Sequence, residues 1–240
     1  MSVYFDPAAG EVNENIGNNS FSEWPKDATD AERKRFLNAR NGDHEAAVGT
    51  LQAHLEWRKK TFPLAPGAPK LGNGLPNFVQ FTPAVAKDGS RIVFVMAGMI
   101  ELQLATSEEY ALAIASLFEE QLDHSSTEKV TVVLDVRGGD GWPNPSATSL
   151  VPFIRVVAGV LSTNFPDRLR RLIVAPLPWV ASALWSVVKQ FLDPVTADKG
   201  VIINGSADRS SQLPEAVLEH LSDEALGVLN ACRSAQVRQE

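Results

Sequence analysis

The sequence predicts an α/β fold in which an N-terminal helical subdomain precedes a mixed, mainly parallel sheet. Two observations predict it. Strand patterns alternate with helical patterns of several turns throughout the second part of the chain, as they do in sheets connected by helix crossovers. The first part carries only helical signals. With 240 residues, of which 44% are hydrophobic, the chain is long enough for one large domain or two modest ones.

The N-terminal part divides into a loose segment and a helical one. Residues 1–28 are predicted to be a flexible terminus because asparagine and glycine are frequent there. Residues 29–62 are predicted to form a subdomain of two helices. Thr29 and Glu32 have the spacing of a capping box at the start of the first helix. Apolar residues at three- and four-residue spacing mark the second helix.

Residues 63–76 contain four prolines and three glycines, which suit neither a helix nor an interior strand, so they are predicted to be a linker. The sheet domain is then expected over residues 77–240. Its strands are expected at 78–82, 92–97, 130–136, 171–175 and 200–203, the first two joined as a hairpin. Its helices are expected at about 106–122, 147–164, 179–192, 214–220 and 223–235. Pro152 either kinks its helix or marks the true start of that helix.

Composition excludes several classes of protein. Lys and Arg number 22 against 29 Asp and Glu, a net charge of −7, which argues against a general nucleic-acid binder. The single cysteine, Cys232, excludes an intramolecular disulfide framework and suits a reducing compartment. The histidines and this cysteine show no zinc-ligand spacing, so no metal is expected. The longest uncharged run, 172–188, is interrupted by Pro176 and Pro178, so a soluble, cytoplasmic protein without a signal peptide is expected.

Familiar catalytic motifs are absent from the sequence, and no nucleophile–base pair stands out, so an enzyme is not expected. A glycine-rich loop, 137–141, directly follows the predicted strand that contains Asp135. In an α/β sheet a loop at the carboxyl end of a strand is a common ligand site. The glycine spacing alone favours a plain flexible turn over a ligand site. An enzyme that uses Asp135 and this loop is therefore the last of the hypotheses.

The segment 178–192 (PWVASALWSVVKQFL) is apolar on nearly every side when it is arranged as a helix, and only Lys189 is charged. Such a helix must bury both faces. It is either a central core helix or one wall of a pocket for an apolar ligand, and the pattern alone leaves both open.

Four motifs together resemble the CRAL-TRIO lipid-binding family, of the phosphatidylinositol/phosphatidylcholine transfer type. Residues 191–199 (FLDPVTADK) are similar to the family's F-L-D-P-x-T-x-x-K signature. The other three are NFPDRL at 164–169, VLDVRG at 133–138, and RFLNAR at 35–40 followed by WRK at 57–59. Their order and spacing hold from about residue 30 to 228, so the resemblance covers most of the chain.

The resemblance implies an apolar pocket between the sheet and the helices, which holds one phospholipid as ligand and needs no other cofactor. It implies a set of headgroup-binding residues: Arg40, Asp167, Arg168 and Lys199. It also implies a movable gate helix that lines the acyl pocket: Trp179, Leu184, Trp185, Val188, Phe191 and Leu192. A guanidinium and an ammonium group suit a phosphate diester, and a carboxylate can accept hydrogen bonds from ring hydroxyls.

Two departures from the family pattern weaken inositol recognition. Asp167 replaces a glutamate and is one methylene shorter, and Asn41 stands where a lysine is usual. A surface ion-pair set, Asp167 with Arg170 or Arg171, is the alternative interpretation of these charges.

The resulting expectation is a monomeric, non-enzymatic lipid-transfer protein that contacts membrane surfaces transiently and does not bind nucleic acid. The alternatives are a carrier or sensor of another hydrophobic ligand, such as a tocopherol-like molecule, and a regulatory module that has lost lipid exchange.

Overall fold

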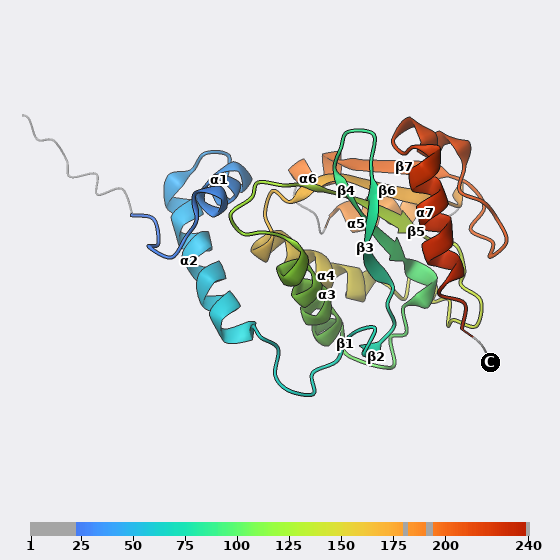
Figure 1. The fold of residues 1–240 in the computed structure, drawn as a ribbon, viewed down its shortest axis with the longest axis horizontal. Coiled ribbons are helices and arrows are strands. Elements are labelled where there is room, and N and C mark those ends of the chain that lie inside the picture. Colours follow the sequence, from blue (N-terminus) through green and yellow to red (C-terminus); the bar gives the residue numbers. More distant parts are fainter. Residues whose placement is uncertain (1–22, 180–181, 191–193, 239–240) are drawn as a thin grey trace, which may run out of the picture.

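The computed structural model describes residues 23–179, 182–190 and 194–238 (Figure 1). A five-stranded sheet in the order β3-β4-β5-β6-β7 forms its centre. The strand β3 is antiparallel to β4, and all other neighbours are parallel. The expected mixed, mainly parallel sheet preceded by helices is therefore confirmed. Most of the terminus that was predicted to be flexible lies outside the described residues.

The N-terminal helices form as their caps predict. α1 spans Asp30–Ala39 and α2 spans His44–Thr61. The Thr29 hydroxyl accepts from the backbone N–H of Glu32, and the Glu32 carboxylate accepts from the backbone N–H of Thr29, which completes the capping box. A small separate core holds the pair together. It comprises Trp24, Ala28, Phe36, Leu51 and Leu55.

The strands match the predicted segments with shifted ends. Their bounds are β3 Val79–Val85, β4 Arg91–Met96, β5 Val130–Asp135, β6 Leu169–Leu177 and β7 Gly200–Asn204. The segment predicted to be a linker contains two minimal strands, β1 Lys70–Leu71 and β2 Gly74–Leu75, which pair with each other. Positive φ angles at Gly72 and Gly74 permit the tight turn between them.

The helices of the sheet domain are mostly shorter than their patterns predict. They are α3 Ser107–Gln121, α4 Val151–Asn164, α5 Ser182–Lys189, α6 Pro194–Asp198 and α7 Asp223–Ser234, with short 3-10 segments η1 Ala97–Met99 and η3 Glu215–Glu219. Pro152 lies in the first turn of α4, so it marks the true start of that helix. The sequence analysis did not identify α6.

The two faces of the sheet differ in burial. On one face, which we call the aliphatic face, five side chains from four strands are only half-buried: Val95, Val132, Leu134, Leu172 and Ile202. The strand register places them in adjacent rows. Side chains that point the other way, such as Phe94, Val133 and Ile173, are fully buried.

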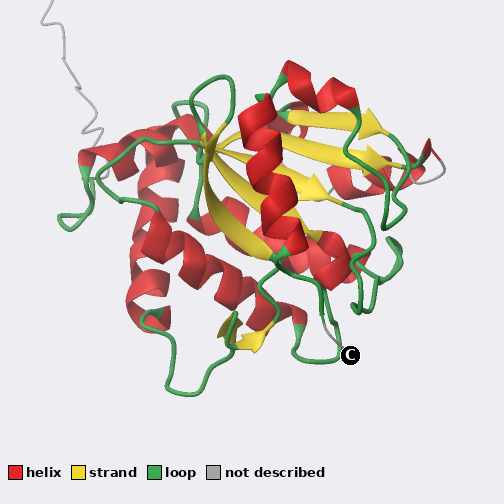
Figure 2. Ribbon diagram, turned by 45° about the vertical axis from the view of Figure 1, so that its right-hand side comes forward, coloured by secondary structure: helices red, strands yellow, loops and turns green. Residues whose placement is uncertain are grey.

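Helices cover both faces, but with different completeness. Phe81, which pairs with Val93 on the aliphatic face, contacts Phe118 of α3, so α3 lies on that side. Asp135, on the other face, contacts Arg233 of α7, so α7 covers the buried face. Figure 2 shows α7 crossing the sheet, with the remaining helices around and behind it.

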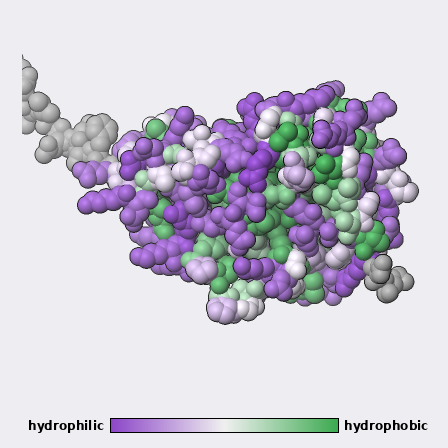
Figure 3. Space-filling model, in the orientation of Figure 1, coloured by the Kyte–Doolittle hydropathy of each residue, from purple (hydrophilic) through white to green (hydrophobic). Residues whose placement is uncertain are grey.

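The surface differs in hydropathy from one end of the molecule to the other. In Figure 3 the end formed by α1 and α2 is mainly hydrophilic, whereas hydrophobic residues gather over the middle and the opposite end of the molecule. Across the residues that the structure describes, none of the helices is both long and apolar enough to cross a membrane.

Candidate functional site

One edge of the sheet collects the charged side chains that precede its parallel strands. Lys129 comes directly before β5, Arg168 before β6 and Lys199 before β7. Because the amino ends of neighbouring parallel strands meet at the same edge, these residues are brought together. The structure therefore gathers three of the four predicted headgroup residues, Asp167, Arg168 and Lys199, at one place.

Asp167 is the centre of this cluster. Its carboxylate accepts a hydrogen bond from Asn38 Nδ2 at 2.9 Å and forms a close ion pair with Lys129. Lys199 Nζ lies 4.0 Å from the same carboxylate. A φ of +56° turns Asp167 toward these partners, in a conformation that aspartate tolerates better than most residues. The side chain is only 13% exposed, yet it faces two ammonium groups.

Arg40 lies on the helical subdomain, close in sequence to the Asn38 that contacts Asp167. It is the residue that ends α1, two positions after Asn38, and its side chain is exposed. Within the described part of the chain, no hydrogen bond or ion pair of the Arg40 guanidinium is found. The guanidinium can therefore meet a ligand without first breaking an ion pair.

Arg168 differs from the other three predicted residues. It is only 4% exposed, and its guanidinium donates to the carbonyl oxygens of Glu128, at 2.9 Å, and Asp123. Burial lowers the pKa of Arg168, and neighbouring carboxylates partly oppose this effect. These contacts fix the loop at 122–129 that leads into β5. In this structure Arg168 therefore positions the edge of the site.

Two residues of the cluster were missed by the sequence analysis, Asn38 and Lys129. Lys129 carried a usable signal, because it directly precedes a predicted central strand just as Arg168 precedes the next one. Asn38 carried none, since its contact with Asp167 depends on how α1 docks.

The alternative pairing of Asp167 with Arg170 or Arg171 is wrong. Arg170 Nε instead lies 3.1 Å from the Asp88 carboxylate, and Arg171 contacts His220 Nδ1 at 2.7 Å. Both arginines therefore belong to other parts of the surface.

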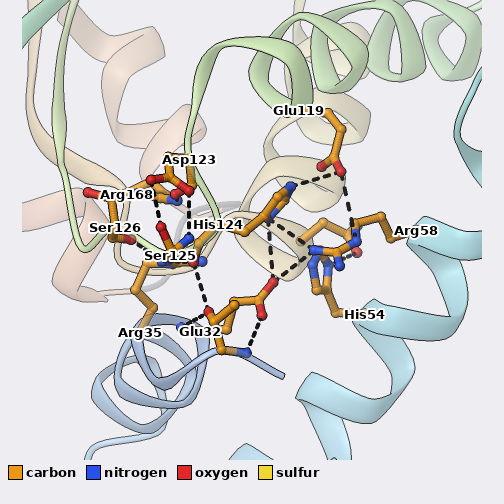
Figure 4. A network of polar contacts seen from close by, with 12 residues as sticks. Glu32, Arg35, His54, Arg58, Glu119, Asp123, His124, Ser125, Ser126 and Arg168 are labelled. Carbon is orange, nitrogen blue, oxygen red and sulfur yellow. Dashed lines mark hydrogen bonds and ion pairs between the residues drawn. The ribbon is translucent and has the colours of Figure 1, made fainter. Parts of the chain in front are cut away.

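A buried polar network docks the helical subdomain beside this edge (Figure 4). Glu32 is fully buried and accepts from Arg58 Nη1 at 2.8 Å, while its other carboxylate oxygen accepts from the Thr29 backbone. His124 lies between two carboxylates, with Nδ1 3.4 Å from Glu32 and Nε2 2.9 Å from Glu119. The network thus links α1, α2 and the end of α3.

The pKa values of this network follow from its charges. Hydrogen bonds first to Glu119 and then to Glu32 raise the pKa of His124 to about 9. Burial by itself would raise the pKa of Glu32, but the contact with His124, the Thr29 amide and the Arg58 charge outweigh it and lower this pKa to about 2. Both groups are therefore charged near neutral pH.

Arg35 connects the network to the charged edge. It is 4% exposed and donates to the carbonyl oxygens of His124 and Ser126. Burial, and next the charge of Arg168, lower the pKa of Arg35 to about 10. The loop at 122–129 is therefore held by Arg35 from the helical subdomain and by Arg168 from the sheet.

The predicted gate helix lies at the aliphatic face. In α5, Trp185 packs against Gly200 of β7, and Lys189 Nζ lies 5.7 Å from the centre of the Trp185 ring. Val188 is half-buried, while Trp179 is 81% exposed. Of the other predicted gate residues, Phe191 and Leu192 lie outside the described residues, and so does the side chain of Leu184. The expected helix that is buried on every side is not what α5 shows, because Ser186, Val187 and Lys189 are exposed.

The arrangement is amphipathic. Two ammonium groups, those of Lys129 and Lys199, lie near the Asp167 carboxylate at the edge of the sheet. Gly200, directly after Lys199, belongs to the aliphatic face. Cationic donors suit phosphate oxygens and a carboxylate suits hydroxyl donors, while the half-buried aliphatic rows suit hydrocarbon.

Comparison with known proteins gives a consistent result. The model of the CRAL/TRIO domain family matches residues 76–225. A protein named phosphatidylinositol transfer protein SFH5, from Coccidioides immitis, is 28% identical over 228 residues, covering 83% of this chain and 49% of its own length. The Arabidopsis thaliana protein named phosphatidylinositol/phosphatidylcholine transfer protein SFH12 is 26% identical over 217 residues, covering 82% of this chain and 39% of its own. The chain thus spans about half the length of such relatives, or less.

A solved structure supports the fold. The crystal structure of Sfh5 superposes with a TM-score of 0.62 at 18% sequence identity, covering 88% of this chain and 75% of that one. At this identity the likeness concerns the arrangement of helices and strands.

Proposed function

Because this chain belongs to the CRAL/TRIO domain family, we propose that it is a non-enzymatic carrier of one phospholipid, phosphatidylinositol or phosphatidylcholine, between membranes. It needs no cofactor besides the bound lipid, acts as a monomer in the cytoplasm and touches membrane surfaces only transiently. The names of the relatives support the class of ligand.

The observation that carries the proposal is the position of Asp167 between two lysines at an edge of the aliphatic face. In phosphatidylinositol the headgroup phosphate binds Lys199 and Arg40, and the carboxylate of Asp167 accepts from the inositol hydroxyls. Lys129 neutralises Asp167 while the ligand is absent. Arg168 supports the same edge from beneath by fixing the loop at 122–129.

The aliphatic face then receives the acyl chains. Two acyl chains contain roughly 30 methylenes, and moving them from a bilayer into water would cost about 25 kcal/mol. A carrier must therefore shield nearly all of this surface from water. The half-buried side chains of β4, β5, β6 and β7 supply one apolar wall, and α5 supplies the cover.

The cover must open for exchange. α5 is short, begins soon after Pro178 and is followed by Pro194 at the start of α6. Exposed apolar side chains lie on and beside it: Trp179, Val187 and Val195. Such side chains are stabilised by contact with a bilayer, so this region is the proposed membrane contact.

The test is transfer between vesicles. Donor vesicles that contain labelled phosphatidylinositol or labelled phosphatidylcholine are mixed with unlabelled acceptors and catalytic amounts of the protein. Transfer that is proportional to protein concentration supports a carrier. Failure to transfer either lipid, by protein whose circular dichroism is that of a folded α/β chain, would contradict it.

A second candidate is a carrier of another hydrophobic ligand. It is favoured by the short carboxylate of Asp167 and by Asn41 at the turn after α1, where a further cation is usual. The same vesicles loaded with a tocopherol distinguish the two candidates.

A further inference from the structure

A cavity lies at the opposite end of the sheet from Asp167. It has a volume of about 190 Å³ and is lined by the end of β4, by η1, by the loop at 137–142, by Arg209, and by the end of α7 with the residues that follow it. Because β5 is six residues long, the cavity and the charged edge at Lys129 are separated by about 20 Å. Pockets for drug-sized ligands usually occupy 300 Å³ or more, so this cavity is too small for a phospholipid.

The loop at 137–144 is held in a defined conformation by hydrogen bonds. The Asn144 side chain accepts from the Gly139 N–H at 2.6 Å and donates to the carbonyls of Gly139 and Trp142. A Cβ added to Gly98 would lie 2.7 Å from the Gly139 nitrogen, so η1 and the loop touch closely. The cavity wall is therefore preorganised.

The charges around the cavity do not balance. Arg137 is 3% exposed and binds the fully buried carboxylate of Asp135 through Nε and Nη2. Arg233 approaches the same carboxylate at 3.3 Å, so two guanidinium groups share one carboxylate. The third arginine, Arg209, lies 3.8 Å from Asp140, beyond hydrogen-bond distance. Among the side chains that the structure describes at this cavity, three guanidinium groups thus meet two carboxylates, and Arg137 and Arg233 also donate to the carbonyl oxygens of Ser211 and Gly138.

The excess at Arg137 and Arg233 is costly because both guanidinium groups are largely buried beside the single carboxylate of Asp135. Burial lowers the pKa of Arg233, and the charge of Arg137 adds to that effect against the attraction of Asp135. An anion in the cavity would compensate the excess charge. Apolar atoms of Met96, Met99 and Trp142 line the rest of the wall, which suits a short organic group.

We propose that this cavity binds a small oxyanion, such as a phosphate monoester with a few carbon atoms. Its charged end lies between Arg209 and Arg233, and its organic part lies against Met96, Met99 and Trp142. The glycine-rich loop at 137–141 is then a ligand-binding wall, in the usual position for one in an α/β sheet.

The segment 234–238, after α7, packs over the cavity. Trp142 Nε1 donates to the Gln236 carbonyl at 2.6 Å, and the Arg238 N–H donates to the Asp140 carbonyl at 3.2 Å. The Arg238 guanidinium also stacks on the Trp142 ring at 5.2 Å and pairs with Glu101. A bound anion should therefore slow hydrogen exchange in residues 137–144 and 234–238.

The test is calorimetric titration with inorganic phosphate and with glycerol 3-phosphate, at constant ionic strength maintained with sodium chloride. Both should bind, glycerol 3-phosphate more tightly because it also contacts apolar atoms. Arg209→Gln should weaken both by about tenfold. Its side chain is 59% exposed, so the variant should fold with an unchanged melting temperature.

A matched control variant makes the result specific. Arg170→Gln removes an arginine of similar exposure on another surface and should leave phosphate binding unchanged. Lys199→Ala removes a cation of the proposed headgroup site and therefore reports any phosphate that binds there instead. The proposal is overturned if wild-type protein does not bind either anion, if Arg170→Gln weakens binding as much as Arg209→Gln, or if Lys199→Ala abolishes binding that Arg209→Gln leaves unchanged. These results are obtained without measuring lipid transfer.

Discussion

The indole ring of Trp185 occupies the space in which a side chain at Gly200 would lie: a Cβ built on Gly200 would be 2.5 Å from Trp185 Cζ2. This contact seats α5 on the first residue of β7. The residue before it is Lys199, whose ammonium group lies 4.0 Å from Asp167. The proposed cover of the acyl chains and the proposed headgroup site therefore meet at two consecutive residues.

Replacing Gly200 with alanine should displace α5. A methyl group at this position collides with the indole ring, and the backbone of β7 is fixed by its pairing with β6. We expect faster hydrogen exchange in residues 182–189 and faster lipid exchange between vesicles, with little change in the hydrogen exchange of β5.

Gly159→Ala in α4 is the matched control, because a Cβ there meets nothing within 4 Å. It should leave α5 unchanged and stabilise the fold by about 0.5–1 kcal/mol. If hydrogen exchange in α5 of the Gly200→Ala variant is unaltered, the contact between Trp185 and Gly200 does not hold the helix in place.

Periodicity and caps were enough to predict the sheet and most helices, because each depends on local spacing. The capping box of Thr29 and Glu32 forms as expected. The start of α4 was less predictable: the helix was expected from about residue 147, but it begins at Val151, directly before Pro152. α6 was missed because it is only five residues long and has no periodicity to detect.

Only those residues of the candidate site that lie within a recognised motif could be predicted from the sequence. Asp167 and Arg168 are adjacent in sequence, and Lys199 precedes a strand that pairs with theirs. Burial could not be read from the motif. Nothing in the sequence around Arg168 distinguishes a guanidinium that meets solvent from one that donates to the carbonyls of Glu128 and Asp123. The contact of Asn38 with Asp167 depends on docking of the helical subdomain.

Lys199→Ala should change lipid selectivity more than lipid capacity. The ammonium group is proposed to bind the phosphate of an inositol headgroup, whose hydroxyls Asp167 holds beside it. A choline headgroup has no hydroxyls for Asp167 to hold, so its phosphate is not fixed at Lys199. We expect phosphatidylinositol transfer to fall about tenfold while phosphatidylcholine binding stays within about twofold. Vesicle transfer of each labelled lipid measures this. Lys60→Ala, an exposed lysine near the end of α2, should leave both rates unchanged. Equal loss of both lipids in a folded Lys199 variant would refute the headgroup assignment.

Val188→Asp should stop transfer without unfolding the protein. Val188 is half-buried in α5, so a carboxylate there opposes either acyl packing or contact with the bilayer. Transfer should fall at least tenfold, whereas the melting temperature should drop by only a few degrees. Val187→Asp, at a position that is 37% exposed, should impair vesicle binding but not lipid retention. If Val188→Asp unfolds the chain, α5 is a fixed core helix. If transfer is unaffected, the acyl chains lie elsewhere.

The buried polar network around Glu32 and His124 should make the free energy of unfolding depend on pH in both the acidic and the alkaline range. The pKa of Glu32 is lowered to about 2, so its contribution is present above about pH 4.5 and is lost as the pH falls toward 2. The pKa of His124 is raised to about 9, so its contribution is complete below about pH 6.5 and is lost as the pH rises through 9. Both are complete between pH 4.5 and 6.5.

Glu32→Gln isolates this network. Removing a buried partner from charged neighbours should lower the free energy of unfolding by about 3 kcal/mol near pH 6, as measured by urea denaturation. The variant should also lose most of the decline in stability between pH 4.5 and 2. Glu45→Gln, an exposed glutamate in the first turn of α2, should cost less than about 0.5 kcal/mol. A Glu32 variant as stable as the wild type would mean that the network does not hold the helical subdomain in place.

Mass spectrometry of the intact protein under native conditions shows directly whether the chain carries a phospholipid. The protein is purified from cells, its bound mass is measured, and the ligand is then extracted and fragmented. We expect one phospholipid per chain, with an inositol or choline headgroup, and reduced phosphatidylinositol occupancy in Lys199→Ala. Protein that carries no lipid, and that takes up neither phosphatidylinositol nor phosphatidylcholine when incubated with vesicles, would refute the proposed lipid carrier.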